Sequence, residues 1–281
     1  MQEQKVALVT GSSSGIGFET ALLLARTGIF TYASMRNKEK SSKIKEVANE
    51  EKLPLQVLQL DVNEDQSVSN AIDEIMKEKS KINVLVNNAG YGIFGSLEDL
   101  SIEEIKSQFE TNFYGVIRVT QKVIPIMRKS KTGGVIVNVS SVGGLISVPF
   151  LSAYNSTKFA LEGLSESLSY ELEPFGIKVV IIEPGFIKTN IMNSSILAKK
   201  AMDPNSPYSS LTKKVEHYFK TMVNNTSSST PEEVAKTILE AISSKRPQLR
   251  YLVGSDAIAT IQARKGMPED EFRDIIRKQV L

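Results

Sequence analysis

The sequence predicts an α/β fold built on a doubly wound parallel sheet, and three observations support this. Short apolar runs rich in β-branched residues alternate with longer helical patterns along the 281 residues. Most of these runs are apolar on both faces, which is typical of parallel strands that helices cover on each side. The strand–helix alternation repeats six times without a Pro/Gly/Ser-rich linker, as in sheets made of right-handed crossover units. We therefore expect a single domain over residues 1–281.

The expected elements follow one another in a regular order. The strands are KVALVT (5–10), FTYASM (30–35), LQVLQL (55–60), NVLVNN (83–88), GVIVNVS (134–140), KVVIIE (178–183) and LRYLV (249–253). Helical patterns lie at 15–28, 39–52, 64–80, 101–130, 152–174 and 231–245. Thr230 and Pro231 begin the last of these, because threonine is a good N-cap and proline suits the first helical turn. Within 152–174, leucines recur at steps of three and four, the spacing of a core-facing stripe.

Composition and charge exclude several classes of function. The formal net charge is +2 and the Lys and Arg residues are scattered, so we expect no nucleic-acid partner. The absence of cysteine excludes disulfides and thiolate metal sites, and a single histidine, His217, argues against a histidine metal centre. His217 itself suits either the surface or a substrate pocket. The first residues lack a secretory pattern and no apolar run reaches about 18 residues, so we expect a cytoplasmic protein without a membrane span.

Tyr154 and Lys158 lie on the leucine-rich face of the helix expected at 152–174. Ligands bind at the carboxyl ends of parallel strands, where this helix begins, so both side chains should border a ligand cleft. Residues four apart are neighbours on a helix. An ammonium within about 4–6 Å lowers the pKa of a phenol by roughly 1–3 units from about 10, which suits the pair to acid–base chemistry. The alternative is a core tyrosine beside a lysine that extends to solvent.

A glycine-rich stretch, VTGSSSGIG (9–17), joins the first expected strand to the first helix. Gly11, Gly15 and Gly17 would allow a tight turn that brings backbone N–H groups to a pyrophosphate at the helix N-terminus. The alternative is an ordinary strand-to-helix turn. The second strand ends without an acidic residue that could bind both hydroxyls of an adenosine ribose. Arg36 stands there instead and can bind a 2′-phosphate, which favours NADP(H) over NAD(H).

Five motifs occur in the order and at the intervals of one enzyme family. They are TGSSSGIG (10–17), NNAG (87–90), VSS (139–141), YNSTK (154–158) and PG (184–185). Over residues 4–190 the chain resembles the short-chain dehydrogenase/reductase family, and SSVGG and KFALEGLSESL resemble its 17β-hydroxysteroid and retinol dehydrogenase branch. The resemblance implies a Rossmann fold and hydride transfer between NADP(H) and a carbonyl or secondary alcohol. NAD(H) remains an alternative, because Ser14 occupies the family's second basic position.

The resemblance also implies a catalytic set of four residues. Tyr154 would exchange a proton with the substrate oxygen, while Lys158 would tune that tyrosine and hold the cofactor ribose. Ser141 would bind the substrate oxygen. It is preferred to Ser140 on spacing, because alternation along a strand should point only one of the two into the cleft. Asn112 would interrupt a helix and orient a water molecule; the alternative is a polar residue on the exposed side of that helix.

Cofactor contacts follow from the same resemblance. The expected residues are Gly11, Ser13, Ser14, Gly15, Ile16, Gly17, Arg36, Asp61, Val62, Asn88, Ala89, Gly90, Tyr154, Lys158, Pro184, Gly185, Ile187 and Thr189. Asp61 and Val62 would contact the adenine, and a solvated turn is the alternative for Asp61. Asn87 is expected to stabilise strand ends rather than to touch the cofactor. No metal is expected in the site.

Residues 186–230 are expected to form a substrate lid, and residues 255–281 a C-terminal helical extension. The apolar residues of the lid are Ile187, Ile191, Met192, Ile196, Leu197, Met202, Leu211, Val215, Tyr218, Phe219, Met222 and Val223. This content, with no arginine in the segment, favours a bulky, uncharged, apolar carbonyl or alcohol substrate. The alternative is that the lid only packs against the domain or a partner subunit. Phe272, Ile275 and Ile276 of the extension are expected to cap the domain.

Oligomeric state and two rival functions complete the expectations. By resemblance, the helices at 101–130 and 152–174 would pair subunits in a homodimer or homotetramer. One rival function is a cofactor-sensing NADP(H)-binding protein without turnover, which the complete Asn–Ser–Tyr–Lys set disfavours. A second is a methyltransferase on a similar sheet, which the Tyr/Lys placement disfavours.

Overall fold

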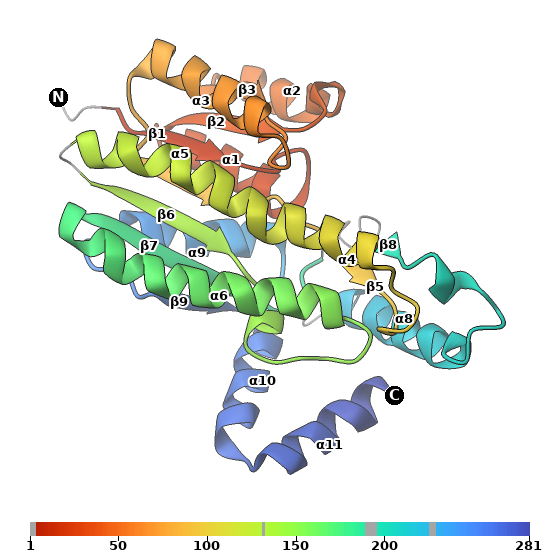
Figure 1. Ribbon diagram of the computed structural model, residues 1–281. Coiled ribbons are helices and arrows are strands. Elements are labelled where there is room, and N and C mark those ends of the chain that lie inside the picture. Colours follow the sequence, from red (N-terminus) through yellow and green to blue (C-terminus); the bar gives the residue numbers. More distant parts are fainter. Residues whose placement is uncertain (1–3, 131–132, 189–195, 225–228) are drawn as a thin grey trace.

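A parallel sheet forms the centre of the chain (Figure 1). The computed structural model describes residues 4–130, 133–188, 196–224 and 229–281, and seven strands of this sheet lie within these ranges. They are β1 (Val6–Val9), β2 (Phe30–Met35), β3 (Leu55–Gln59), β4 (Val84–Asn87), β6 (Gly134–Val139), β7 (Ile177–Pro184) and β9 (Arg250–Val253). Their order is β3-β2-β1-β4-β6-β7-β9, and neighbouring strands are parallel. The predicted doubly wound sheet and single domain are therefore confirmed.

Helices cover both faces of the sheet. They are α1 (Gly15–Arg26), α2 (Ser42–Glu50), α3 (Asp65–Lys79), α4 (Ile102–Phe109), α5 (Gly115–Lys129), α6 (Ser152–Leu172), α8 (Ser209–Asn224), α9 (Pro231–Ser243), α10 (Ser255–Gly266) and α11 (Glu269–Val280). One face packs against α1, α2 and α9 through residues such as Leu24 and Ile238. The other packs against α3, α5 and α6, with Ile75 and Val123 in its core. In Figure 1, α5 and α6 lie in front of the sheet and α9 lies behind it.

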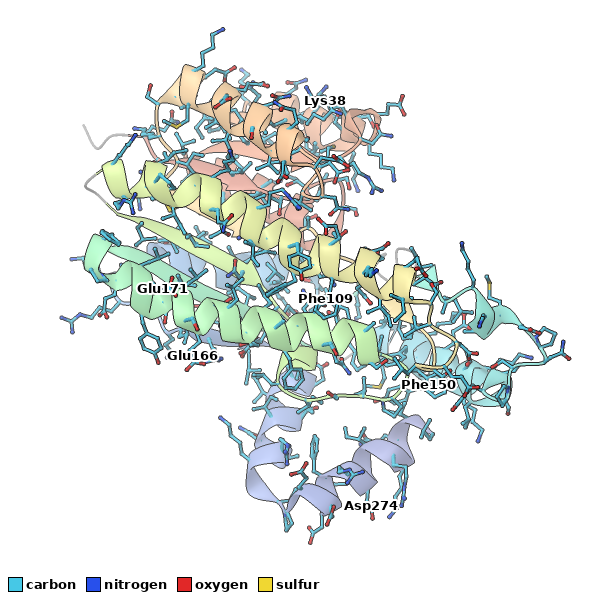
Figure 2. All side chains as sticks on the ribbon, viewed as in Figure 1. Lys38, Phe109, Phe150, Glu166, Glu171 and Asp274 are labelled. Carbon is cyan, nitrogen blue, oxygen red and sulfur yellow. The ribbon has the colours of Figure 1, made fainter. Side chains whose placement is uncertain are left out.

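The strand order reverses at β1, from which the chain runs to β2 and β3 on one side and to β4 on the other. Helices leave the strands on opposite faces at this point, so a crevice opens at the carboxyl ends of β1 and β4. Charged side chains such as Glu171 and Asp274 lie on the outer surface (Figure 2). In the ranges that the structure describes, no helix is both long and apolar enough to cross a membrane.

The helical pattern at 101–130 is not one continuous helix, because a π-helical turn, η2 (Glu110–Tyr114), separates α4 from α5. This interruption lies where the resemblance implied one, at Asn112. Asn112 lies in this turn and is only 1% exposed. Directly after the turn, a Cβ atom at Gly115 would lie 2.7 Å from Val62 Cγ2, so the helix can approach the end of β3 only with glycine there. Wide turns of this kind often mark functional sites. The helical pattern conceals the turn, because apolar residues continue on both sides of it.

A second, two-stranded parallel sheet lies beyond the carboxyl end of β4. It pairs β5 (Ile93–Phe94) with β8 (Ile196–Leu197). Helices α8 and α11 pack together in the same region, on the right and lower right of Figure 1, where Phe219 and Val280 share one apolar cluster. The expected lid and the expected C-terminal extension therefore contact each other through these two helices.

The apolar residues of the C-terminal extension are used in different ways. Phe272 is 5% exposed and packs with Ile146 and Ile261, and Ile276 packs against the same cluster. These two residues cover the domain as expected. Ile275, in contrast, is exposed.

A buried chain of amide and hydroxyl groups joins the sheet to two of its helices. Asn87 Nδ2 at the end of β4 donates to Asn138 Oδ1 on β6 (2.8 Å) and to Thr120 Oγ1 on α5 (3.0 Å). Asn138 Nδ2 donates in turn to Ser165 Oγ on α6 (2.8 Å). All four side chains are buried, so the loss of one would remove buried hydrogen bonds that water cannot replace.

Asn138→Ala should lower the free energy of unfolding by about 2–3 kcal/mol, because it removes two buried hydrogen bonds. Asn87 then keeps only its bond to Thr120, and Ser165 only its bond to the Leu161 carbonyl oxygen. Chemical denaturation measures this change. Asn70→Ala is the control, because Asn70 is exposed and only accepts a hydrogen bond from Gln66; it should change stability by less than about 0.5 kcal/mol. Equal effects of the two substitutions would show that the network does not stabilise the fold.

Candidate active site

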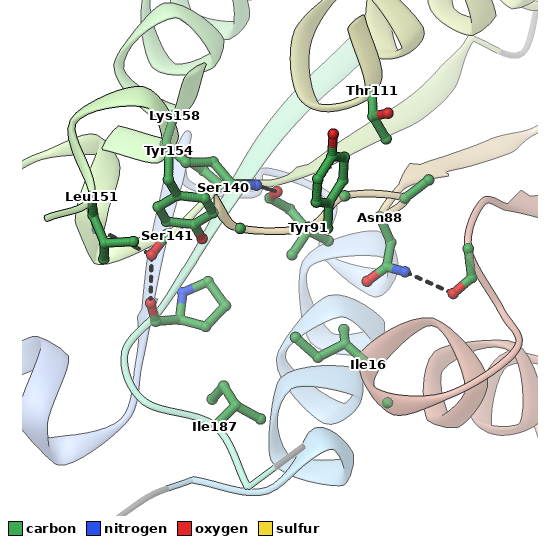
Figure 3. Close-up of a pocket in the computed structure, with 18 of the residues that line it drawn as sticks. Ile16, Asn88, Tyr91, Thr111, Ser140, Ser141, Leu151, Tyr154, Lys158 and Ile187 are labelled. Atoms are coloured by element: carbon green, nitrogen blue, oxygen red, sulfur yellow. Dashed lines mark hydrogen bonds between the residues drawn. The ribbon is translucent and has the colours of Figure 1, made fainter. Parts of the chain in front are cut away.

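A cleft of about 1270 Å³ opens at the carboxyl edge of the sheet (Figure 3). Residues that follow β1, β2, β3, β4, β6 and β7 line it, together with residues of α6, α8, α10 and α11. The expected residues in the lining are Gly11, Ser13, Ser14, Gly15, Ile16, Arg36, Asp61, Val62, Asn88, Ala89, Gly90, Ser141, Tyr154, Lys158, Pro184, Gly185 and Ile187. Gly17 and Asn112 lie behind this lining, and Thr189 falls outside the described residues.

The glycine turn after β1 interlocks with the NNAG segment after β4. Gly11 has φ +69°, and a Cβ atom on it would lie 2.8 Å from the Ala89 Cα atom. Asn88 Nδ2 donates to the carbonyl oxygens of Thr10 (2.9 Å) and Gly11 (3.1 Å). A Cβ atom on Gly17 would collide with the Asn88 amide. Gly17 is therefore required for packing behind the turn, and Gly11 for the turn itself.

The first turn of α1 presents its backbone N–H groups to the cleft. Ser14 is the N-cap residue and its side chain makes no capping hydrogen bond. No acidic residue occupies the first turn, so the partial positive charge of the helix N-terminus is not offset there. Together with the close backbone approach at Gly11, this is the arrangement that binds phosphate groups.

Two basic side chains line the cleft after β2. Arg36 follows the strand directly, is exposed and lines the cleft. Lys40 lies in the 3₁₀ turn η1 (Lys38–Ser41) and also lines the cleft. Sequence reasoning missed Lys40, although its position four residues after Arg36 is a signal that a helical turn would bring the two cations to one side.

Asp61 combines both interpretations that the sequence left open. Its Oδ1 atom accepts a hydrogen bond from the Asn63 backbone N–H (3.1 Å), as in an ordinary turn. It also lines the cleft beside Val62. Asp61 is therefore both part of an ordinary turn and part of the cleft lining.

Tyr154 and Lys158 lie at the start of α6, where the helix meets the cleft. Lys158 Nζ lies 5.7 Å from the centre of the Tyr154 ring and donates to the Val139 carbonyl oxygen (2.9 Å). Ser141 Oγ accepts from the Gly143 backbone N–H (3.0 Å) and contacts the Pro184 carbonyl oxygen at 3.5 Å. Figure 3 shows Tyr154, Lys158 and Ser141 grouped on one wall of the cleft.

Ser140 lines the cleft as well as Ser141. The Ser140 Oγ atom, however, is buried and lies beside Glu162, away from Tyr154. The two hydroxyls therefore have different neighbours, in agreement with the preference for Ser141. Only Ser141 has a hydrogen bond with Tyr154.

The pKa values of the pair differ from the expectation. Burial raises the pKa of Tyr154, and the hydrogen bond with Ser141 only partly offsets that rise. Burial also lowers the pKa of Lys158 to about 8, against an opposing effect of the Glu162 charge. The expected lowering of the tyrosine pKa by the lysine is therefore wrong for this structure, because the removal of Tyr154 from water has the larger effect.

Asn112 lies behind the cleft lining and hydrogen-bonds two segments that border it. Its Oδ1 atom accepts from the Tyr91 backbone N–H (3.0 Å), and its Nδ2 atom donates to the Tyr91 carbonyl oxygen (2.9 Å) and to Thr157 Oγ1 (3.2 Å). These bonds connect the segment after β4 to α6. The alternative of an exposed polar residue is excluded.

The segment after β7 and helix α8 form the apolar end of the cleft. Its lining includes Ile187, Ile196, Tyr218, Phe219, Met222 and Val223 from the expected lid. Met202 is exposed and outside the lining, and Ile191 and Met192 fall outside the described residues. His217 is exposed on α8, which favours the surface interpretation for this residue.

The C-terminal extension, which contains none of the five motifs, contributes Asp256, Ala259, Thr260, Ile276 and Gln279 to the lining. Asp256 in the first turn of α10 accepts from the Phe186 backbone N–H through Oδ2 (2.7 Å) and lines the cleft. Ile276 and Gln279 reach the cleft from α11.

Comparisons with known proteins agree with this geometry. The chain matches the short chain dehydrogenase family over residues 5–201. An uncharacterized oxidoreductase of Bacillus subtilis, YusZ, is 38% identical over 283 residues, which cover 99% of each chain. Retinol dehydrogenase 8 of Homo sapiens is 37% identical over 257 residues, which cover 88% of this chain and 80% of that protein. A short-chain dehydrogenase structure from Streptomyces avermitilis superposes with a TM-score of 0.82 at 29% identity, covering 98% and 96% of the two chains.

Solved structures of this fold also include complexes with 5-hydroxy-NADP and with NAD. The family match extends over more than half of the chain and contains the glycine turn, Ser141, Tyr154 and Lys158. The chain therefore belongs to the short-chain dehydrogenase/reductase family of oxidoreductases and resembles its retinol dehydrogenase-like branch.

Proposed function

We propose that the chain is an NADP(H)-dependent oxidoreductase that acts on the carbonyl or secondary alcohol of a bulky apolar substrate. The observation that carries this proposal is the buried Lys158 ammonium beside Tyr154 and Ser141, in the same cleft as the glycine turn. A module that only bound a nucleotide would not need an acid–base phenol at this position.

The cleft suits a dinucleotide in three respects. The turn at Gly11 leaves no space for a side chain, so the backbone itself forms the cradle. The first turn of α1 offers N–H groups to a pyrophosphate. Lys158 offers ammonium hydrogens to ribose hydroxyls. When bound, the nicotinamide would supply a hydride to the substrate carbon or accept one from it.

The proton is handled by the residues of α6 and the segment after β6. Because burial raises the pKa of Tyr154, its phenol is protonated at neutral pH and can donate to a carbonyl oxygen in the reductive direction. Ser141 would hold the same oxygen while negative charge develops on it. Lys158 gives one hydrogen to the Val139 carbonyl, which leaves two for its other partners. With a pKa of about 8, the lysine is mostly charged at neutral pH.

Tyr154→Phe should lower kcat on the order of 10²–10⁴-fold, because only the acid–base group is lost. The Kd for NADPH should change little, because the ring keeps its packing. Tyr170→Phe is a matched control on the same helix, where the tyrosine is 67% exposed; it should keep full activity. Steady-state kinetics and NADPH fluorescence titration measure both quantities. NADPH binding by the wild-type chain without turnover on any carbonyl tested would support the cofactor-sensing alternative instead.

The preference for NADP(H) rests on Arg36 and Lys40. Both are exposed cations in the cleft lining, and the end of β2 carries no carboxylate that would repel a 2′-phosphate. The family's other basic position is Ser14 in this chain, so Lys40 supplies a second positive charge from a different place in the cleft lining. The two together support the phosphorylated cofactor over NAD(H).

Arg36→Asp should raise the Kd for NADPH on the order of 10- to 100-fold, because a charge-assisted hydrogen bond is replaced by repulsion. NADH binding should not weaken. Lys38→Asp makes the same charge change two residues away and outside the cleft lining, so it should have a small effect that added salt removes. Equal losses in the two variants would show that Arg36 acts only through general charge.

The substrate class is supported by the apolar end of the cleft. The Phe186 and Phe219 rings pack with their centres 5.7 Å apart, and Met222 lines the same region. Val142 and Ile146 line the cleft near Ser141. Such a wall suits an apolar body, and a methionine adapts to irregular shapes. The relative named retinol dehydrogenase 8 is consistent with a substrate of this kind.

Across a series of ketones, kcat/KM should rise roughly fourfold for each added methylene that is buried, which corresponds to about 0.8 kcal/mol. Met222→Gln should flatten this dependence, because it replaces an apolar wall by an amide. Met202→Gln is the control, since Met202 is 63% exposed and lies outside the lining. A preference for small polar ketones would contradict the substrate class while leaving the catalytic residues in place.

A homodimer or homotetramer is part of the same proposal. Large apolar side chains are exposed along the outer side of η2 and α6, including Tyr114, Phe159 and Tyr170. Burial of such a surface between subunits would be favourable.

A further inference from the structure

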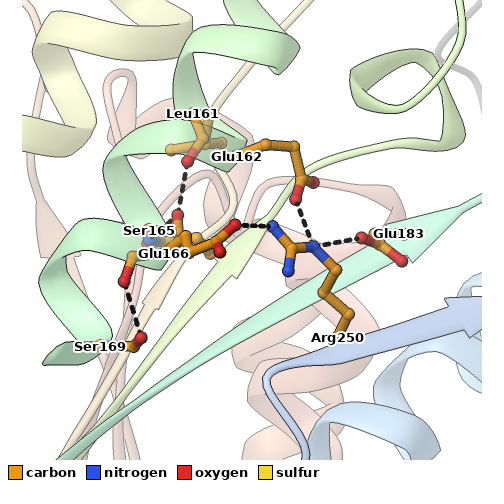
Figure 4. Close-up of polar contacts among 8 residues, drawn as sticks. Leu161, Glu162, Ser165, Glu166, Ser169, Glu183 and Arg250 are labelled. Atoms are coloured by element: carbon orange, nitrogen blue, oxygen red, sulfur yellow. Dashed lines mark hydrogen bonds and ion pairs between the residues drawn. The ribbon is translucent and has the colours of Figure 1, made fainter.

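Arg250 on β9 lies among three carboxylates (Figure 4). Its Nε atom is 3.0 Å from Glu162 Oε2 and 3.4 Å from Glu183 Oε1, and one terminal nitrogen is 2.7 Å from Glu166 Oε2. The two innermost carboxylates come from different elements, Glu162 from α6 and Glu183 from β7. One guanidinium therefore contacts three acidic groups.

The inner part of this cluster is buried and incompletely hydrogen-bonded. Glu162 is 5% exposed and Glu183 is 1% exposed, whereas the Glu166 side chain is 44% exposed. Glu162 Oε1 and Glu183 Oε1 are buried oxygens that make no well-formed hydrogen bond; the 3.4 Å contact of Glu183 Oε1 with Arg250 is an ion pair, and the Ser140 hydroxyl lies beside Glu162. Two ionised carboxylates placed together away from water would be strongly unfavourable. A proton held by one of them would supply the missing donor and remove one charge.

Burial raises the pKa values of both carboxyl groups, and the nearby cations oppose this rise only in part. Burial and Glu162 raise the pKa of Glu183 to about 8, against Arg250 and Lys265. Burial also raises the pKa of Glu162, against Ser140, Arg250 and Lys158. These groups, with Glu166 on the outer side of Arg250, are the charged and polar neighbours of the pair on α6, β9, α10 and the segment after β6.

The pair is also coupled to the catalytic lysine. Glu162 follows Lys158 by one turn of α6, and its negative charge favours the charged form of that lysine. Glu183 immediately precedes Pro184, whose carbonyl oxygen contacts Ser141. The carboxyl pair is thus joined by short chain segments to both sides of the candidate active site.

We propose that Glu162 and Glu183 share one proton at neutral pH, and that the loss of this proton in mildly alkaline solution keeps the Lys158 ammonium charged. The inference rests on the proposed function for its catalytic consequence. Glu162 and Glu183 are positioning residues in this scheme: they touch neither substrate nor cofactor, and they act on the reaction through the charge of Lys158.

The pH dependence of stability follows from the sign of the Glu183 shift. Between the ordinary carboxyl value of 4.5 and about 8, the folded chain holds a proton that the unfolded chain has lost. The free energy of unfolding therefore falls as the pH rises through this range, and the loss is complete above about 8. In Glu183→Gln, a neutral amide supplies the donor to Glu162 at every pH.

The first experiment measures stability by chemical denaturation between pH 6 and pH 9. The decline with pH should be smaller in Glu183→Gln than in the wild type. Glu166→Gln is the control, because Glu166 contacts the same arginine but is exposed and has a lowered pKa; it should keep the wild-type decline. Equal pH slopes in the wild type and Glu183→Gln would overturn the shared proton. If Glu183→Gln does not fold, the infrared carbonyl band of a protonated carboxyl in the wild type, present at pH 7 and lost at pH 9, decides the same question.

The second experiment follows the charge of Lys158 directly. The ¹³Cε resonance of Lys158 is titrated in lysine-labelled protein and is assigned by its loss in Lys158→Met. The midpoint should lie about half a unit or more lower in Glu183→Gln than in the wild type, because the pair can no longer become doubly charged. An unchanged midpoint would overturn the coupling.

Kinetics separates this inference from the proposed function. The alkaline limb of kcat/KM should shift to lower pH in Glu183→Gln by the same amount as the Lys158 midpoint. If the wild type has no turnover but both physical titrations behave as expected, the proposed function fails and the carboxyl pair stands. If turnover is normal and the two titrations do not respond to the substitution, the pair fails and the proposed function stands.

Discussion

A buried ammonium is the constraint around which the site is arranged. Lys158 is only 7% exposed, and a charge in such a position needs hydrogen-bond acceptors and a nearby counter-charge. The Val139 carbonyl at the end of β6 supplies an acceptor, and Glu162 supplies negative charge from the next turn of α6. These contacts fix where α6 lies along the sheet. The position of Tyr154 in the cleft follows from that placement.

The sheet and much of the cleft could be predicted, because their signals are local. Runs that are apolar on both faces identify buried parallel strands, and each strand end lies next to the residues that follow it in the sequence. Gly11, Ser141 and Tyr154 all lie within a few residues of a strand end or a helix start. The topology then brings them to one edge, so order along the chain was enough to place them in one cleft.

The remaining features depend on distances that the sequence pattern does not encode. The π-helical turn at Asn112 exists because its side chain reaches the Tyr91 backbone, which is 21 residues away. The direction of the Tyr154 pKa shift depends on how much water the fold excludes, which a spacing of four residues does not reveal. Asp256 meets Phe186 across 70 residues, and Glu183 meets Arg250 between two strands of the sheet. In each case the partner is set by tertiary packing.

The contribution of α11 to the cleft has a consequence for how this scaffold can diversify. Ile276 and Gln279 reach the cleft from a helix that carries none of the catalytic or glycine-turn residues. The same helix packs against α8 through Val280 and Phe219. With the proposed function, substitutions in α11 would change the ligand-facing wall while leaving the residues proposed for hydride and proton transfer in place. Substrate selectivity and the chemical step would then depend on separate parts of the chain.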